Sequence, residues 1–275
     1  MPGKLGLIAG GGTLPRRIIE ACHAQGRAVF VVALDGQTDA ATLEGDVPHI
    51  RIRMGAAGKA VKALRGAECE ELVLAGPVRR PSFSELRPDL TAARFLSRVG
   101  AKALGDDGLL RAVMDLLEEE GFRVIGVHDI LGDILASEGV WGREQPDEDA
   151  WRDIRRGLQI AGDLGRQDIG QAVVVQQGIV LGVEAIEGTD RLLQRCGELR
   201  RPGPGGVLVK IKKPGQDDRA DLPTVGRHTV EGAAKAGLRG IAVEAGATIV
   251  MEPDDLVAAA DAAGLFVVGV AVDKG

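Results

Sequence analysis

The chain has 275 residues, of which 45% are hydrophobic and 27% charged, and its formal net charge is −6 at pH 7. This length and composition are ordinary for a globular protein of two domains. The net negative charge argues against a surface built to neutralise nucleic-acid phosphates. The three cysteines are far apart and lack metal-binding spacing, which argues against a disulfide framework or a thiolate zinc site. No apolar run is long enough to cross a bilayer, so we expect a cytoplasmic protein with only peripheral membrane contact.

The first half alternates apolar runs with amphipathic runs, which is the pattern of βαβ units in a parallel sheet. The expected elements are strands at 5–9, 28–34, 71–75 and 124–128 and helices at 14–25 and 106–120. We therefore predict a Rossmann-like, substrate-binding domain over residues 1–135.

A polar stretch with glycine and proline interrupts this pattern, and it predicts a linker over residues 136–150. The second domain, residues 151–275, begins with a helix and then a hairpin that turns at Gln177-Gly178. Its expected elements are strands at 172–176, 179–185, 207–212, 240–243, 248–251 and 265–270 and helices at 153–164, 229–236 and 253–263. The fold class is therefore α/β, with a parallel-sheet domain followed by a mixed-sheet domain that carries the catalytic groups.

A glycine loop, Gly10–Gly12 followed by Thr13, joins the first strand to the first helix. Its unhindered amides could approach a phosphate at the positive end of that helix. A dinucleotide-binding fingerprint would need a third glycine where Pro15 stands, although Asp35 imitates its ribose acceptor. A phosphate site, another ligand loop and a plain tight turn all remain open for this segment.

A second loop with binding potential follows the strand at 71–75, and it contains Gly76, Arg79 and Arg80. Ligands of parallel sheets collect beyond the carboxyl ends of the strands. The planar arginine fork suits a phosphate, so the pair predicts a phosphate clamp, with solvated surface charge as the plain alternative.

The strongest chemical signal lies just past the expected strand at 207–212. Lys210 and Lys213 are followed by Gln216 and then by a loop with three carboxylates. Mg²⁺ binds through one or two such carboxylates and the phosphates of its substrate. The carboxylates are Asp217, Asp218 and Asp221. The alternative is a solvated acidic loop whose charge the lysines neutralise. The segment Leu-Pro-Thr-Val-Gly after Asp221 favours a site, because its proline fixes a backbone dihedral just before the next helix.

The end of the hairpin offers one more acidic group. Glu184 ends the strand, and Glu187-Gly-Thr-Asp turns into a helix. Either Glu187 or Asp190 could join the carboxylates of the acidic loop, whereas Thr189 or Asp190 would also serve as a helix N-cap.

Six segments, in order along nearly the whole chain, resemble one family: UDP-2,3-diacylglucosamine pyrophosphatases of lipid A biosynthesis, the type unrelated to calcineurin-like phosphoesterases. They are Leu7-Ile-Ala-Gly-Gly-Gly, Gly76-Pro-Val-Arg-Arg-Pro, Gly105-Asp-Asp-Gly-Leu-Leu-Arg, Asp168-Ile-Gly-Gln-Ala-Val-Val-Val, Glu184-Ala-Ile-Glu-Gly-Thr-Asp and Lys213-Pro-Gly-Gln-Asp. The resemblance implies Mg²⁺-dependent hydrolysis, with Mn²⁺ as a substitute. The products would be UMP and 2,3-diacylglucosamine 1-phosphate, and the lipid substrate would lie between two domains. Contact with the inner-membrane surface is expected, no nucleic-acid partner is expected, and a homodimer stays open.

The resemblance and the residues together suggest roles for particular side chains. Asp221 is the expected catalytic carboxylate. The expected metal ligands are Asp217, Asp218, Asp221 and Glu187. The expected substrate-binding residues are Gly11, Gly12, Thr13, Gly76, Arg79, Arg80, Gln171, Thr189, Lys210, Lys213, Gln216 and Thr224. Two other functions remain as alternatives. They are an NAD(P)-dependent oxidoreductase, suggested by the glycine loop, and a noncatalytic lipid- or nucleotide-binding protein.

Overall fold

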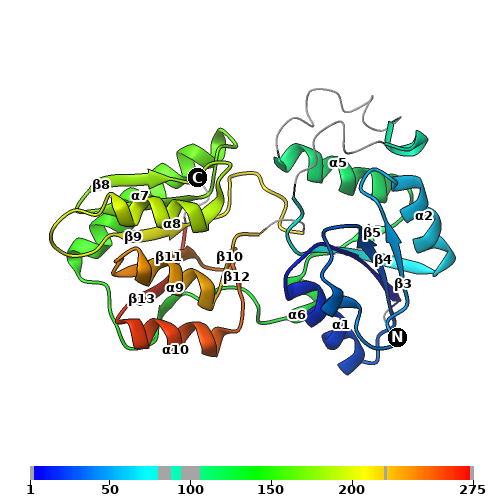
Figure 1. Ribbon diagram of the computed structural model, residues 1–275, viewed down its shortest axis with the longest axis horizontal. Helices are drawn as coiled ribbons and strands as arrows, with labels where there is room; N and C mark the ends of the chain where they lie inside the picture. The colour runs from blue at the N-terminus through cyan, green and yellow to red at the C-terminus, as the bar shows by residue number, and fades with distance from the viewer. Residues whose placement is uncertain (1–2, 80–87, 94–105, 220–221, 273–275) are drawn as a thin grey trace. The chain divides into compact units, whose positions relative to one another are not determined.

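The computed structural model describes residues 3–79, 88–93, 106–219 and 222–272, with the side chains of 106 and 107 left out. It divides into two compact units (Figure 1). The first comprises residues Met1–Gly132 together with Asp217–Asp221, and the second comprises Asp133–Gln216 and Leu222–Gly275. A short piece of the second half of the sequence therefore belongs to the first unit. None of the helices in the described ranges has the length and apolar character needed to cross a membrane.

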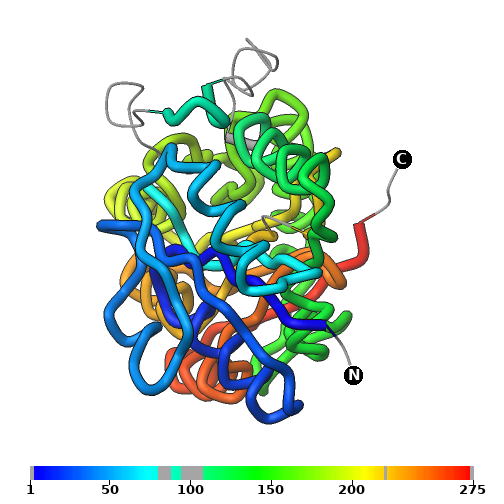
Figure 2. Tube along the Cα trace, turned by 90° about the vertical axis from the view of Figure 1, so that its right-hand side faces the viewer, coloured from blue at the N-terminus to red at the C-terminus, as the bar shows by residue number. Residues whose placement is uncertain are grey.

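The first unit is built on a five-stranded parallel sheet in the order β3-β2-β1-β4-β5. Its strands are β1 (Lys4–Ala9), β2 (Val29–Leu34), β3 (His49–Ile52), β4 (Cys69–Ala75) and β5 (Arg123–Val124). Its helical elements are α1 (Leu14–Ala24), η1 (Ala40–Leu43), α2 (Ala57–Gly66), α5 (Asp106–Glu119) and α6 (His128–Leu131). In Figure 2 the chain from β1 to β4 runs from blue to cyan. The predicted parallel sheet is confirmed.

The strands of this sheet are apolar because helices cover both faces. Helices α2 and α5 contribute Leu64 and Met114 to the core on one face, and α1 contacts α6. The expected strand at 124–128 is shorter than predicted, because β5 ends at Val124 and a turn follows. The carboxylate of Asp129 accepts a hydrogen bond from the Gly126 amide at 2.8 Å, and this i to i+3 bond favours the turn into α6 over an extended chain.

The second unit is built on a six-stranded mixed sheet in the order β6-β13-β11-β9-β7-β8. Strands β9, β11 and β13 are parallel, whereas β6, β7 and β8 make antiparallel pairs. The strands are β6 (Gly139–Trp141), β7 (Ala172–Gln176), β8 (Ile179–Val183), β9 (Val207–Lys210), β11 (Gly240–Glu244) and β13 (Phe266–Val270). A separate parallel pair consists of β10 (Thr224–Val225) and β12 (Ile249–Val250). The predicted mixed sheet is confirmed.

Helices cover both faces of this sheet as well (Figure 1). Helix α7 packs on one face through Ile154, and the other three helices pack on the opposite face through leucine, valine and alanine side chains. The bounds are α7 (Glu148–Arg166), α8 (Gly188–Glu198), α9 (Arg227–Lys235) and α10 (Pro253–Ala263).

The stretch expected to be a linker, residues 136–150, differs from that expectation. Residues Gly139–Trp141 form β6, which pairs with β13 at the sheet edge, and α7 begins at Glu148 with Asp147 as its N-cap. Ser137 packs so closely against Gly269 that a side chain at Gly269 would collide with its carbonyl oxygen. Polar composition suggested a linker, but backbone pairing incorporates this stretch into the second unit.

Candidate functional site

The two loops predicted in the first unit lie side by side. The amide of Gly10 donates to the carbonyl of Ala75 at 2.8 Å, and the amide of Gly11 donates to Pro77 at 2.9 Å. A side chain on Gly10 would come within 2.4 Å of the Gly76 carbonyl oxygen, so the close approach requires glycine. Because β1 lies between β2 and β4, these loops mark the point where the chain order of the sheet reverses, the usual ligand position in such sheets.

A carboxylate already contacts the glycine loop. The amide of Gly12 donates to Oδ2 of Asp39 at 2.6 Å, and the amide of Arg79 donates to the side chain of Gln37 at 2.8 Å. All three glycine amides therefore have acceptors within the protein, and a phosphate at this loop would have to displace Asp39. Thr13 is exposed and makes no side-chain cap. Sequence reasoning missed Asp39, which lies five residues after β2 at the start of η1.

A denser set of polar groups lies in the second unit where strand β9 ends and the neighbouring strand β7 begins. We call this end of the strands the polar edge. Lys210 ends β9, and it pairs with Ala172 on β7 and Val243 on β11. The amide of Glu184 donates to Ala172 at 2.8 Å, which brings the end of β8 to the same edge. Four of the predicted binding residues thus lie on neighbouring elements: Gln171, Lys210, Lys213 and Gln216.

Several polar side chains at this edge are buried. Lys210 is 7% exposed, Glu184 is 6% exposed, and both Gln216 and Glu244 are 5% exposed. Burying a charged group is costly unless it is compensated, so each of these side chains needs a polar partner within reach. The ammonium of Lys210 donates to the carbonyl of Thr224 at 3.0 Å, and the amide of Lys212 donates to Oε2 of Glu244 at 2.9 Å.

Glu184 orients two of the predicted binding residues. Its Oε1 accepts a hydrogen bond from the hydroxyl of Thr189 at 2.7 Å, and its Oε2 accepts one from the amide of Gln171 at 3.2 Å. Thr189 therefore does not cap α8, whose N-cap is Glu187. The side-chain Oε1 of Gln171 is buried with no hydrogen-bond partner. This edge therefore presents a buried acceptor that no other described residue satisfies.

Lys213 and Gln216 close a tight turn just before the acidic loop. The side chain of Gln216 accepts from the Lys213 amide at 3.1 Å, and the Gln216 amide returns a bond to the Lys213 carbonyl at 3.1 Å. The ammonium of Lys213 forms an ion pair with Asp168 at 2.8 Å. A cation is thus fixed beside the buried polar groups.

Thr224 connects this cluster to a pocket of about 420 Å³. The Thr224 carbonyl accepts the Lys210 bond, and Thr224 also lines the pocket. The remaining lining residues come from the start of α9 and the turn before α10, namely Val225, Gly226, Arg227, His228, Thr229, Glu231, Met251 and Glu252. The volume lies in the range of small-molecule sites.

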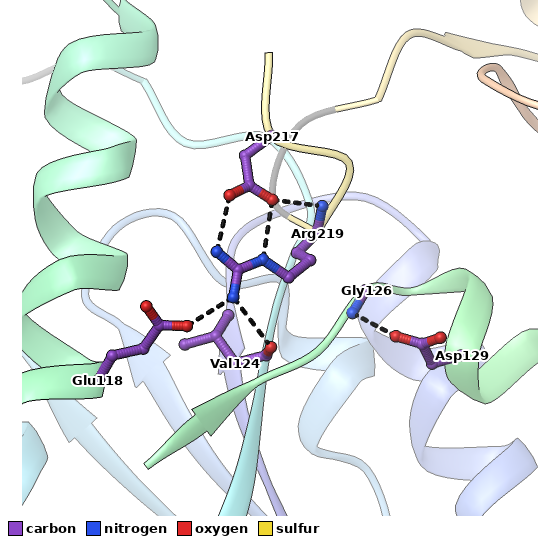
Figure 3. A network of polar contacts seen from close by, with 6 residues as sticks. All are labelled: Glu118, Val124, Gly126, Asp129, Asp217 and Arg219. Atoms are coloured by element: carbon purple, nitrogen blue, oxygen red, sulfur yellow. Dashed lines mark hydrogen bonds and ion pairs between the residues drawn. The ribbon is translucent and has the colours of Figure 1, made fainter. Parts of the chain in front are cut away.

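The first part of the acidic loop makes an ion-pair network in the first unit (Figure 3). Both carboxylate oxygens of Asp217 accept from the guanidinium of Arg219, at 2.9 and 2.7 Å. The hydrogen bonds from this guanidinium hold the pKa of Asp217 below its ordinary value. Asp218 is exposed. Asp221, the expected catalytic residue, and Arg80 lie outside the described residues.

Glu187 is also paired with an arginine. Its Oε1 lies 2.6 Å from Nη2 of Arg195, and its other oxygen accepts from the Ala185 amide at 3.2 Å. A hydrogen bond from its own backbone amide, together with the Arg195 pair, lowers the pKa of Glu187. Asp190, the alternative ligand, is exposed beside His228.

The contacts of the expected metal ligands show whether their carboxylates are available to a metal ion. Within the described ranges, no group of three or more His, Cys, Asp or Glu side chains could hold a metal ion. Asp217 and Glu187 are engaged by Arg219 and Arg195, so neither is arranged as a metal ligand in this structure.

Comparison with known proteins shows a match along the whole chain. The LpxI N-terminal domain matches residues 4–134, and the LpxI C-terminal domain matches residues 137–268. A protein of Caulobacter vibrioides named UDP-2,3-diacylglucosamine pyrophosphatase LpxI is 44% identical over 274 residues, covering 97% of each chain. The family resemblance expected from the six segments is confirmed.

Solved structures give only weak likenesses. The Bordetella bronchiseptica enzyme WbmG, in complex with NAD and UDP, is 15% identical, with a TM-score of 0.28 over 42% of this chain and 35% of its own. A putative NAD-dependent epimerase/dehydratase from Methylobacillus flagellatus is also 15% identical, with a TM-score of 0.26 over 50% of this chain and 42% of its own. Neither supports a conclusion about ligands. On the two domain matches and the full-length identity, the chain belongs to the LpxI family.

Proposed function

We propose that this protein hydrolyses the pyrophosphate bond of UDP-2,3-diacylglucosamine and releases UMP and 2,3-diacylglucosamine 1-phosphate. The observation that carries the proposal is the 44% identity, over 97% of both chains, to a protein named for this activity. Because the match covers both units, it includes the whole machinery rather than one shared domain.

The polar edge of the second unit suits this chemistry. Cleavage of a pyrophosphate depends on cations that stabilise the charge of the phosphoryl oxygens and on positioning of the attacking water. Lys210 and Lys213 supply fixed positive charge, and Thr189 and Gln171 supply oriented hydrogen-bonding groups. We assign phosphate binding to the two lysines of this edge, contact with O–H or N–H donors of the sugar to Thr189 and Gln171, and contact with the nucleoside to the pocket at Thr224.

We assign the catalytic carboxylate to Asp221, which orients the attacking water in this proposal. Its support is the sequence: Asp221 stands in the loop that follows the buried Lys210 strand. Asp221→Asn should lower kcat by on the order of 10²-fold or more, as loss of other electrostatic stabilisers does. Circular dichroism and thermal unfolding should remain unchanged, and near-normal turnover would remove Asp221 from this role.

We also propose Mg²⁺ as the cofactor, with Mn²⁺ as a substitute. The ion would neutralise charge on the pyrophosphate, and it fits this chain because Mg²⁺ commonly takes only one or two carboxylates and otherwise uses substrate phosphates and water. Activity should disappear with a chelator and return with Mg²⁺. Isothermal titration should detect Mg²⁺ binding much more strongly with the product UMP present than with protein alone.

The proposed substrate carries two acyl chains, and we propose on this ground that the enzyme works at the cytoplasmic face of the inner membrane. Ile186 is fully exposed and Ile169 is 44% exposed, and both lie next to the polar edge in sequence, beside Glu187 and Gln171. We propose that they contact lipid. Ile186→Asp should raise KM in vesicles and reduce flotation with them, while its kcat with detergent-solubilised substrate stays unchanged.

The direct test incubates purified protein with UDP-2,3-diacylglucosamine and Mg²⁺ and separates the products by chromatography. UMP and the sugar 1-phosphate should appear in equal amounts. Release of UDP instead of UMP would show cleavage of a different bond. Absence of turnover, with saturable NAD or NADP binding instead, would replace the proposal with the oxidoreductase alternative.

A further inference from the structure

The acidic loop changes units along the chain. Gln216 belongs to the second unit, Asp217–Asp221 group with the first, and Leu222 belongs to the second again. Loops that merely lie on a surface do not need specific attachment. The contacts of Asp217 and Arg219 therefore need an explanation beyond solvated charge.

Arg219 holds Asp217 with the full geometry of a guanidinium fork. Nε lies 2.9 Å from Oδ1, and Nη2 lies 2.7 Å from Oδ2. The backbone amide of Arg219 also donates to Oδ1 of Asp217 at 3.0 Å. Two parallel bonds fix the plane of the guanidinium, and so the direction of its remaining nitrogen is fixed too.

That remaining nitrogen contacts two elements of the first unit (Figure 3). Nη1 lies 2.5 Å from Oε1 of Glu118 on α5 and 3.5 Å from the carbonyl oxygen of Val124 at the end of β5. Arg219 and Glu118 are 101 positions apart in sequence, so the contact belongs to the tertiary fold. One guanidinium thus attaches the loop to both a helix and a strand end.

We infer that Asp217 and Arg219 are positioning residues, and that Asp217 is not a metal ligand: together with Glu118 they anchor the acidic loop on α5 and β5. Asp221, the proposed catalytic carboxylate, follows Arg219 by two residues in sequence, so we expect loss of the anchor to affect turnover. The inference rests on the proposed function for its kinetic consequence, but the anchor itself can be measured without substrate.

The kinetic test uses Arg219→Lys, Asp217→Asn and the double variant. Lysine keeps the charge but cannot make the planar fork. Each single change should lower kcat on the order of 10-fold to 10²-fold with little change in KM, as small misplacements of catalytic groups do. The double variant should be no worse than the more severe single one, because both remove the same anchor.

A matched control is available on the same helix region. Glu120, just after α5, pairs with Arg65 at 2.7 Å, and the Arg65 side chain is 57% exposed. Glu120→Gln removes an Arg–Glu pair of the same chemistry away from the acidic loop. Its kcat should stay within about twofold of wild type, as expected for an exposed pair, whereas Glu118→Gln should lower kcat measurably.

Two further readouts separate anchoring from metal binding and from loss of fold. Amide hydrogen exchange over residues 213–224 should accelerate in Arg219→Lys while the other peptides and Tm stay unchanged. The Mg²⁺ concentration for half-maximal activity should not move in Asp217→Asn. A raised Mg²⁺ requirement, or unchanged exchange in the loop, would overturn the inference. If wild-type protein releases no UMP, the proposed function fails, and the exchange measurement still decides the anchor.

Discussion

Substitution of the buried Glu184 should change both the stability of the protein and its KM, and the two effects can be measured separately. It accepts hydrogen bonds from the Thr189 hydroxyl and the Gln171 amide and is 6% exposed. Hydrogen bonds to a charged group contribute about 1.5–3 kcal/mol and neutral ones about 0.5–1.5 kcal/mol. Glu184→Gln keeps the shape but weakens both bonds, and relief of the buried charge offsets part of the loss. We therefore expect the free energy of unfolding to fall by roughly 1–2 kcal/mol. Each kcal/mol corresponds to a decrease of about 2–4 °C in Tm.

The effect on activity should follow from Thr189. Its hydroxyl hydrogen is committed to Glu184, so its oxygen meets a ligand as an acceptor. With glutamine, this orientation is no longer enforced, and one lost substrate hydrogen bond corresponds to about a tenfold rise in KM. Thr189→Val should raise KM by a similar factor, and the double variant should add little, because the two residues act as one unit.

Asp153 provides the control for this experiment. It is 3% exposed and accepts from the amides of Gln177 and Gly178, at 2.9 and 2.6 Å, at the other end of the hairpin. Asp153→Asn should destabilise to a comparable extent without changing KM. Urea unfolding and steady-state kinetics measure both quantities. If Glu184→Gln lowers stability but leaves KM at the wild-type value, as in the control, then Glu184 is structural and the reasoning is refuted.

Two other predictions concern titration. The pKa of Asp217 is lowered, chiefly by the hydrogen bonds from Arg219, so the pair stabilises the fold fully above about pH 4 and less as the pH falls through the lowered pKa. The stability difference between wild type and Asp217→Asn in urea unfolding should therefore shrink in acid, and a constant difference would contradict it. Burial raises the pKa of Cys196 to about 11 and raises those of Cys22 and Cys69. These thiols should resist iodoacetamide at neutral pH until their own unit unfolds, and rapid alkylation of the native protein, read by mass spectrometry, would contradict this.

Features with a local cause could be predicted from the sequence. The hairpin turn at Gln177-Gly178 was predicted from turn chemistry, and both residues adopt positive φ, at 53° and 75°. The alternation of apolar runs predicted the parallel sheet of the first unit in the same way. Strand β3 was not predicted, because His49–Ile52 is short and alternates polar with apolar residues. His49 and Arg51 are exposed in the structure. The membership of β3 in the sheet depends on pairing with β2, which local pattern does not encode.

The candidate site was predictable only in part for the same reason. Lys210 was identified from its neighbours in sequence, and Gln171 came from the family segment that begins at Asp168. Gln171 lies just before β7, the strand that pairs with the strand of Lys210. Glu244 was not identified, although a charged residue directly after four apolar or small strand residues was a readable signal. The contact between Arg219 and Glu118 spans 101 positions. A local pattern could suggest the pair of Asp217 and Arg219, which are two positions apart, but not the contact of the same guanidinium with Glu118.

Burial of polar groups does not by itself locate the site, because both ends of β7 carry them. At one end Gln176 is fully buried, and its amide donates to Arg201 and Pro204 at 2.9 and 2.8 Å while its oxygen accepts from Arg201 at 2.9 Å. Every polar atom there has a partner, so that end needs no ligand. At the other end, the buried Oε1 of Gln171 has none. An unsatisfied buried acceptor costs about 1–3 kcal/mol. Among the described residues, Thr42, His128 and Thr248 also have a buried polar atom without a partner, but Gln171 is the one bonded to Glu184, beside Lys210. This difference between the two ends of one strand supports the proposal that the ligand binds at the edge with Glu184 and Lys210.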